Sequence, residues 1–500
     1  MFEKFKYLGL RSLAVAWVVV ILLLPLTSFP LLSRLAGNTM VAPASFIPLL
    51  WVILFWFIFY LIKRGRLPRE TIPFLFFITV GLVASASAFF LDTPPFKDGN
   101  LLGEEIRALV TLAIGASFYL VSSSWLAQSR SRLESTLKWI NISGVFLLLW
   151  ALVQGIFIYL NQGNYPPLVV NLQHLVSSGN LFATRITAFA YEPSWLGHQL
   201  NLLFLPFWFA ATISGLSTFR FRLWKLSLEN ILLGCGVVVL FLASRVGTLS
   251  LLLIITFLVI YLNVYLARRL HAWSLPLLFK LPTLLQKILR SLLPVLLFLA
   301  FLGIYALGAL GLGWGLSHVD PRLAVFFQIQ SWAEFKTLTG SIYVLFNYLQ
   351  FAERYVYWVA GWYIFNTHPI LGVGLENAGF YFQHALPAYG WHLPEVMLIY
   401  FREAALPNIK SMWVRLLAET GVVGFSSFIA WYYVMFRSAW SMRLNQHRLF
   451  KVIGWFGLFV LVAYITEGFS TDTFALPYLW VSLGIVSAAG AILRNPKLEE

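Results

Sequence analysis

The chain of 500 residues is 60% hydrophobic and only 11% charged, which is too apolar for a soluble protein of this size. Its net charge of +15 comes from basic residues spread over short loops, which favours orientation in a membrane over nucleic-acid binding. The composition therefore predicts an all-α integral membrane protein.

Apolar runs recur along the chain, and most are long enough to cross a hydrocarbon core of about 30 Å at 1.5 Å per residue. We therefore predict twelve membrane-spanning helices. Their windows are residues 13–31, 44–62, 72–91, 106–126, 139–160, 195–216, 229–243, 247–267, 291–314, 411–436, 451–469 and 476–493.

The loops between these windows alternate in charge. The acidic residues Asp92, Asp98, Glu104, Glu105, Glu467 and Asp472 lie in or beside the alternate loops. Every second loop is basic, with Lys63, Arg64, Arg66, Arg69, Arg130, Arg132, Lys138, Arg220, Arg222, Lys225, Arg268, Arg269, Lys280, Lys287, Arg290, Arg437, Arg443, Arg448, Lys451, Arg494 and Lys497. Basic loops face the cytoplasm, so both termini are predicted to be cytoplasmic.

Two features of the middle of the chain refine this topology. The windows 229–243 and 247–267 could form one helix, but it would be nearly twice a bilayer crossing, so a tight outer turn at Arg245 is favoured. Basic residues among Leu and Trp in residues 268–290 predict an amphipathic helix on the inner leaflet. The single cysteine, Cys235, excludes a disulfide framework and is expected to be a small core residue.

The topology divides the chain into three parts. Residues 1–314 hold nine spans, residues 315–410 form a large, mostly helical extracytoplasmic loop, and residues 411–500 hold three spans. Polar and aromatic residues concentrate in this loop between long apolar runs. We therefore expect the chemistry there, together with the outer turns near Glu192 and Arg245.

Arginines on the outer face are the first candidate site residues, because positive charge there runs against the orientation rule. They are Arg185, Arg245, Arg322, Arg354 and Arg402. A guanidinium offers a planar fork of donors suited to phosphate oxygens, so Arg245 and Arg354 could bind a diphosphate together. The alternative is pairing with a glutamate or snorkelling to the interface, and it is preferred for Arg322 and Arg402.

A second candidate group lies where the sixth span begins. Glu192 precedes Pro193, which suits the first turn of a helix. Its carboxylate could accept a proton from a nucleophilic hydroxyl, or it could simply cap the helix N-terminus and favour its dipole, and both interpretations stay open. His198, one turn inside the span, is expected to be a hydrogen-bonded core histidine.

The loop supplies further candidates. Gly372 and Gly374 lack the context of a nucleotide-binding fingerprint and are expected to form a turn. The residues predicted to contact acceptor or sugar are Trp358, His368, Glu376, Asn377, His384, His392 and Glu419. The spacing of the histidines and the scarce carboxylates argue against a bound metal ion. An interfacial aromatic belt remains the alternative for the aromatic residues.

The order of these motifs resembles that of the O-antigen ligase and polymerase superfamily. The motifs are Arg185 with Glu192-Pro193-Ser194, Ser244-Arg245, Arg354-x-x-x-Trp358, the run from His368 to Gly374, and Leu416-Leu417-Ala418-Glu419-Thr420-Gly421-Val422-Val423-Gly424. The resemblance covers about residues 185–430, and its most specific parts are 354–377 and 416–424.

The resemblance implies an enzyme of the bacterial inner membrane that transfers glycans from undecaprenyl-diphosphate donors at the periplasmic face, with neither metal nor nucleotide cofactor. It further implies that Arg245 and Arg354 contact the diphosphate, with Arg185 and Lys410 as additional contacts. An acceptor hydroxyl would attack the anomeric carbon, and the lipid diphosphate would depart. A chain-length regulator as a further partner is left open.

One departure separates the branches of this superfamily. The ligase branch has a histidine where this chain has Lys410, and a lysine is normally charged and a poor base near neutral pH. We therefore expect a polymerase of O-antigen or exopolysaccharide repeat units, with Glu192 as the base. Ligation of a finished glycan to lipid A core or protein is the alternative. A transporter of lipid-linked sugars comes third, because few charges lie at span centres and no repeat symmetry is visible.

Overall fold

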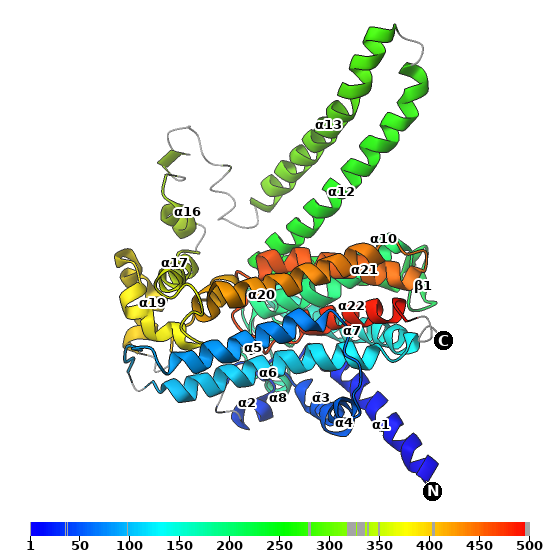
Figure 1. Ribbon diagram of the computed structural model, residues 1–500. Helices are drawn as coiled ribbons and strands as arrows, with labels where there is room; N and C mark the ends of the chain where they lie inside the picture. Colours follow the sequence, from blue (N-terminus) through cyan, green and yellow to red (C-terminus); the bar gives the residue numbers. More distant parts are fainter. Residues whose placement is uncertain are drawn as a thin grey trace. The chain divides into compact units, whose positions relative to one another are not determined.

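The computed structural model describes residues 2–35, 37, 39–97, 99–278, 282–317, 327, 336–337, 340–348, 351–402 and 406–495 (Figure 1). The chain is 75% helical, and the only strands in this described part are β1 (Arg222–Leu223) and β2 (Leu226–Ser227), which pair antiparallel. Residues 1–251 and 357–500 form one compact unit, and residues 252–356 form a second. We call the first unit the helical bundle.

The helices of the bundle that precede the second unit begin and end as follows. They are α1 (Phe2–Leu22), α2 (Pro30–Leu35), α3 (Phe46–Val52), the π-helical turn η1 (Ile53–Phe57), α4 (Ile58–Ile62), α5 (Thr71–Ala88), α6 (Leu101–Leu126), α7 (Arg130–Leu160), α8 (Pro167–Val176), α9 (Pro193–Gln199), the π-helical turn η2 (Leu200–Phe204), α10 (Leu205–Ser214) and α11 (Leu228–Ala243).

The remaining elements include two long helices, α12 (Arg245–Leu278) and α13 (Thr283–Ser317), which lie mostly in the second unit with α16 (Ile342–Tyr348). They are followed by α17 (Ala352–Thr367), the 3₁₀ turn η3 (Asn377–Tyr381), α18 (Phe382–Ala385), the 3₁₀ turn η4 (Ala388–His392), α19 (Pro394–Phe401), α20 (Met412–Met442), α21 (Arg448–Glu467) and α22 (Tyr478–Leu493).

These helices support a membrane protein, although they do not fix the number of spans. Among the described residues, eight helices are long and apolar enough to cross a membrane. Each of the twelve predicted windows overlaps a helix, but four of them hold only α1, the α3–η1–α4 run, α11 and α22, which are shorter in their apolar part. The count of twelve therefore stays a prediction, as does the membrane face on which residues 315–410 lie.

Two details of the sequence interpretation are wrong. Residues 268–290 do not form a separate amphipathic helix, because their described parts continue the long helices α12 and α13. Cys235 is exposed rather than a core residue. The reason is the helical period of α11, whose buried face carries Leu232, Gly236 and Val239 and turns Cys235 outward.

Several helices begin where a polar side chain caps the first turn. Asn100 accepts a hydrogen bond from the Leu102 amide (3.1 Å) at the start of α6, and Ser129 accepts one from the Arg132 amide (3.4 Å) at the start of α7. Ser411 does the same for α20. At the other end of α10, Gly215 ends the helix in the left-handed conformation with φ 64°. These residues set the helix ends independently of hydropathy.

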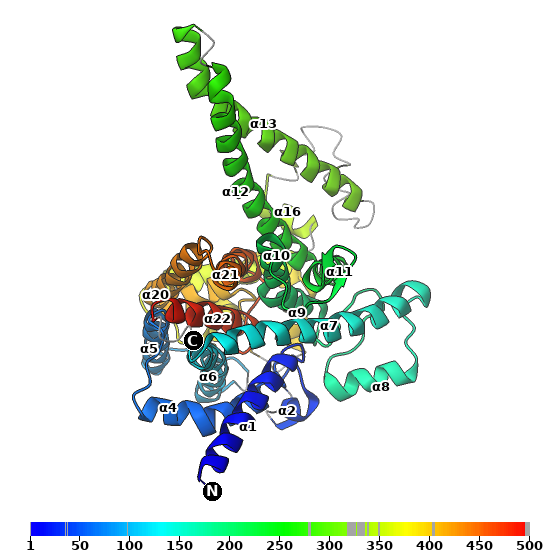
Figure 2. The ribbon, with the colours of Figure 1, turned by 90° about the vertical axis from the view of Figure 1, so that its right-hand side faces the viewer.

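The core of the bundle is centred on α22. Nearly every residue of α22 is buried, against α6, α20 and α21 (Figure 2). Gly484 lets α22 approach α6 closely, because a Cβ there would collide with Ser122. Tyr119 bonds Ser487 of α22 at 2.9 Å and accepts a hydrogen bond from the Trp431 indole at 3.1 Å. The central helix is therefore held by both close packing and buried polar contacts.

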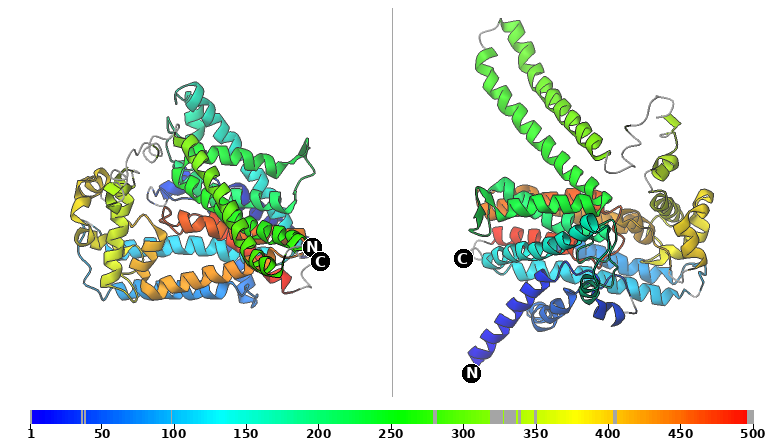
Figure 3. Two further views of the ribbon diagram at one scale, coloured as in Figure 1. Left: turned by 90° about the horizontal axis from the view of Figure 1, so that it is seen from above. Right: turned by 180° about the vertical axis from the view of Figure 1, so that it is seen from behind.

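The connections of the bundle gather at two opposite ends (Figures 1 and 3). At one, which we call the terminal end, Arg494 after α22 forms a bidentate ion pair with Glu70 before α5, at 2.7 Å for both contacts. At the other, the loop end, Lys97 before α6 donates to the Ile399 carbonyl in α19 (2.7 Å). Loops that the charge pattern assigns to one side of the membrane thus share one end of the bundle.

Candidate active site at the loop end

A break in α20 forms the centre of the loop end. Gly421 has φ 60° and ψ −167°, which is not helical and strongly favours glycine. The break frees backbone groups that pair with the segment 369–374. Val373 and Gly374 donate to the carbonyls of Ala418 and Glu419 (3.0 Å each), and Val422 donates to the Pro369 carbonyl (2.8 Å). The segments 369–374 and 416–424, which belong to the most specific parts of the resemblance, are therefore one structural unit.

The glycines of the segment 369–374 make this pairing possible. Gly372 has φ 70° and Gly374 has φ 88°, so the predicted turn is present. A Cβ on Gly372 would collide with the backbone of Glu419, and a Cβ on Gly421 would collide with the Ile370 carbonyl. The segment therefore lies directly against the broken helix.

Arg415, one turn into α20, links three parts of the chain. Its Nε donates to Glu419 (2.9 Å), its Nη2 donates to Glu376 (2.8 Å), and its Nη1 donates to the Asp472 carbonyl. The side chains of Arg415 and Glu419 are each 2% exposed, whereas that of Glu376 is 24% exposed. We call Arg415, Glu419 and Glu376 the Arg415 cluster.

A second buried contact fixes the turn before η3. The Asn377 amide donates to Glu105 of α6 (2.5 Å) and to the Val373 carbonyl (3.1 Å). Asn377 is fully buried, so it and Glu419 hold the site together and do not face solvent. Of the adjacent residues Glu376 and Asn377, both predicted to contact sugar, only Glu376 keeps a partly exposed side chain.

Lys410 lies on the turn that leads into α20. It has φ 55°, and its amide bonds the Asn408 side chain (3.0 Å). Its ammonium group lies 3.4 Å from the Glu395 carboxylate. Asn408 in turn donates to the Asp472 carboxylate (3.1 Å). The turn therefore connects α19 to the segment after α21.

Glu192 occupies the N-cap position of α9, in extended conformation with φ −144° and ψ 163°. Its side chain makes no capping bond and instead accepts a hydrogen bond from Ser194, so a capping role does not account for its carboxylate. The neighbouring Tyr191 amide bonds Thr27 (3.0 Å). The half-buried carboxylate is thus held beside the segment that follows α1.

The segments of Arg185 and Arg245 meet near α9. The Ile186 amide donates to the Leu242 carbonyl (3.3 Å), which brings Arg185 to the end of α11. The Arg185 side chain is exposed, 5.6 Å from the Phe182 ring. Ser244 separates α11 from α12, so the helix break expected beside Arg245 is present. The side chain of Arg245 lies outside the described residues.

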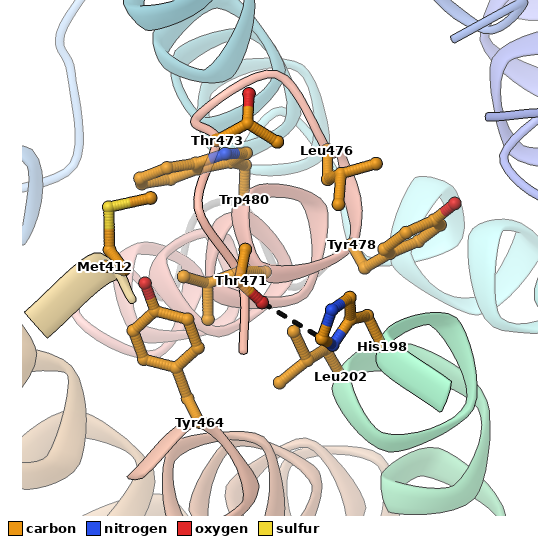
Figure 4. A pocket seen from close by; sticks show the side chains of 10 residues that line it. His198, Leu202, Met412, Tyr464, Thr471, Thr473, Leu476, Tyr478 and Trp480 are labelled. Carbon is orange, nitrogen blue, oxygen red and sulfur yellow. Dashed lines mark hydrogen bonds between the residues drawn. The ribbon is translucent and has the colours of Figure 1, made fainter. Parts of the chain in front are cut away.

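A buried polar group connects α9 to α21, and Figure 4 shows its histidine, His198, beside Thr471 in a small cavity. His198 Nδ1 bonds Glu467 (2.5 Å), and the Asn201 amide bonds both Glu467 (2.6 Å) and the Gly247 carbonyl (2.8 Å). Beside it, Thr471, Met412 and Tyr478 line a cavity of about 10 Å³, enough for about one water molecule. His198 is therefore a buried, hydrogen-bonded histidine, as the sequence predicts.

The remaining predicted contacts are distributed around the loop end. Trp358 packs against Phe469 with ring centroids 5.2 Å apart. His368 contacts Tyr381 (5.4 Å between centroids), and His384 and His392 are exposed. Burial raises the pKa of the Tyr381 phenol, so it remains a hydrogen-bond donor at neutral pH.

Two of the predicted arginines, Arg354 and Arg322, lie outside the described part of the helical bundle. Arg354 lies in residues 252–356, the second unit, which is described by itself. A joint grip of Arg245 and Arg354 on one diphosphate therefore stays a prediction. Arg322 lies outside the described residues.

The sequence interpretation missed Arg415, Glu467 and Asp472. Arg415 lies inside the predicted span 411–436, and an arginine in an apolar window, four residues before a glutamate, was the available signal. In the sequence, Glu467 and Asp472 stand out only as charges in a loop.

No protein-family model matches the chain, and a search of curated proteins finds no match.

Proposed function

We propose that the chain is a glycan polymerase that joins undecaprenyl-diphosphate-linked oligosaccharide repeat units, with its active site at the loop end and that end facing the periplasm. On this proposal the terminal end, with its basic loops, faces the cytoplasm. The product is an O-antigen or exopolysaccharide chain.

The observation that supports this proposal best is the union of the motifs at the loop end. The segment 369–374 pairs with the broken helix α20, and Arg415 joins α20 to Asp472. The Met412 amide bonds the Gly468 carbonyl (2.7 Å), next to Glu467 and its partner His198. Glu192 lies six residues before His198, at the N-cap of the same helix α9. Motifs up to 230 residues apart in the sequence are thus neighbours in one bonded assembly.

The reaction proposed for this site needs positioning and charge. The acceptor hydroxyl oxygen bonds to the anomeric carbon of the donor sugar while the bond from that carbon to the diphosphate breaks. The electron pair leaves with the lipid diphosphate, and the hydroxyl proton passes to Glu192. Arginine side chains, with Lys410, stabilise the charge that develops on the leaving diphosphate.

The environment of Lys410 favours polymerisation over ligation. Lys410 lies 3.4 Å from the Glu395 carboxylate, an arrangement that suits a contact to phosphate or sugar better than the general-base role of the ligase histidine. Within the described residues Glu192 forms no ion pair, and its carboxylate accepts a hydrogen bond from the Ser194 hydroxyl. We therefore propose Glu192 as the base.

Deleting the gene in its host and sizing the lipid-linked glycans tests the proposal. Accumulation of single repeat units on the lipid diphosphate is the expected result. Accumulation of long chains still attached to the lipid would instead assign ligation. An unchanged glycan profile would refute both activities.

A further inference from the structure

A cavity of about 480 Å³ lies at the terminal end of the bundle, opposite the proposed active site. Arg130, Glu134 and Lys138 of α7 line it, together with residues 216–218 and with His447 and Arg448 at the start of α21. Its volume falls within the range of about 300–1,000 Å³ that is usual for small-molecule sites. None of the residues that line it contributes to the polymerase site.

The charged groups in this cavity favour an anion. Arg130 is paired with Glu134 at 2.9 Å, so these two charges offset each other. Within the described residues, neither Lys138 nor Arg448 forms an ion pair with a carboxylate, which leaves two positive charges for a ligand. Because α7 and α21 both begin beside the cavity, their N-terminal dipoles add to the positive potential.

A buried carboxylate near the cavity does not oppose an anion. Glu229 lies behind the wall formed by residues 216–218 and is not among the lining residues. It accepts hydrogen bonds from the Thr218 amide (2.8 Å), the Thr218 hydroxyl (2.8 Å) and the Asn141 amide (2.9 Å). These bonds hold Glu229 away from the cavity and fix the wall in place.

We propose that this cavity binds a phosphate group, supplied by the headgroup of an anionic phospholipid. The apolar residues Leu137, Leu216 and Leu449 share the lining with the cations, so the cavity is amphipathic like a phospholipid. Basic pockets between membrane-spanning helices on the cytoplasmic side bind such headgroups. The bound phosphate would tie together the starts of α7 and α21 and the connection after α10.

Thermal unfolding of the purified full chain in a neutral detergent tests this proposal. The added probes are phosphatidylglycerol, phosphatidylcholine and inorganic phosphate. Phosphatidylglycerol is expected to raise the unfolding temperature of the unaltered chain, because a ligand that binds only the folded state stabilises it. Phosphatidylcholine, which carries no net charge, is expected to have much less effect.

The decisive variant is K138Q/R448Q, with K63Q/R66Q as the matched control, since Lys63 and Arg66 are exposed basic residues in another connection of the terminal end. The cavity variant should bind phosphatidylglycerol about a hundredfold more weakly, because each lost charge-assisted contact costs roughly tenfold. The control should respond like the unaltered chain. Counting bound lipids by native mass spectrometry provides a second measurement if the cavity variant unfolds at a lower temperature without ligand.

The outcomes separate the sources of the phosphate. A response to phosphatidylglycerol that the cavity variant loses supports the lipid headgroup. A response to inorganic phosphate alone, lost in the same variant, supports the phosphate site and assigns a free anion. Equal responses of the unaltered chain and the cavity variant, or equal losses in both double variants, would overturn the proposal.

Discussion

Replacing Arg415 by methionine tests the architecture of the loop end most directly. Methionine keeps the apolar stem but removes the charge and three hydrogen bonds, to Glu419, Glu376 and the Asp472 carbonyl. Glu376, at 24% exposed, can be hydrated after the change, whereas Glu419, at 2% exposed, cannot. The variant therefore leaves one buried carboxylate without its cation.

Removing one partner of a buried ion pair costs about 3–5 kcal/mol, and we expect R415M to lower the free energy of unfolding by that amount. Arg437 on the same helix provides the control, because its side chain is exposed, bonds the Tyr433 hydroxyl at 3.4 Å and forms no ion pair within the described part of the chain. R437M should change stability by less than about 0.5 kcal/mol. Unfolding in mixed micelles of a mild detergent and dodecyl sulfate measures both.

A double variant separates loss of charge from loss of packing. R415M/E419M removes both charges of the buried pair, and replacing such a pair by apolar residues is often nearly neutral or stabilising. We therefore expect it to regain most of the stability that R415M loses. If R415M is as stable as R437M, or if the double variant is no more stable than R415M, then an uncompensated charge on Glu419 is not the cause.

Three further predictions concern the motifs. G421A should cost on the order of 3 kcal/mol, because alanine is strained at φ 60° and its Cβ meets the Ile370 carbonyl, whereas G234A, in the open on α11, should cost nothing in the same unfolding assay. E192Q should abolish polymerisation in membranes without lowering stability, while K63Q, at an exposed position of the terminal end, should leave product unchanged; product from E192Q would exclude Glu192 as the base. R245K and R354K should each reduce product length or amount, since a point charge cannot reproduce a planar fork, and full activity of both would refute a bidentate grip on the diphosphate.

The sequence predicts the helices well because hydropathy suffices for that task. Each of the twelve apolar windows overlaps a helical segment, and the break at Ser244 follows from a bilayer's thickness. Hydropathy says less about which face of a helix is buried, so the exposure of Cys235 required the periodic pattern of α11. It also could not show that α12 and α13 extend through residues 268–290, because a basic helical end and an amphipathic surface helix have similar compositions.

The candidate site was predicted only in part, for a different reason. Glu192 and Lys410 stand out in the sequence because they are polar residues beside apolar spans, and Glu376 because it lies in the polar loop 315–410. The role of Arg415 depends on its contacts with Glu376 and Asp472, which lie 39 and 57 residues away in the sequence. Such contacts depend on the packing of several helices, and a single sequence carries no direct record of them.

The break in α20 makes the loop-end segment 369–374 a structural part of the bundle. A break inside an apolar environment leaves backbone groups without partners, which is tolerated only where other protein groups satisfy them. Here Pro369, Val373 and Gly374 bond the groups freed at Gly421. Removing the segment 369–374 would therefore leave backbone amide and carbonyl groups of α20 without hydrogen-bond partners. It would also separate Glu376 from Arg415. The residues proposed to act on the glycan and the residues that complete the fold are thus parts of one assembly. Substitutions there should affect stability and activity together unless, like E192Q, they leave the buried contacts of the assembly intact.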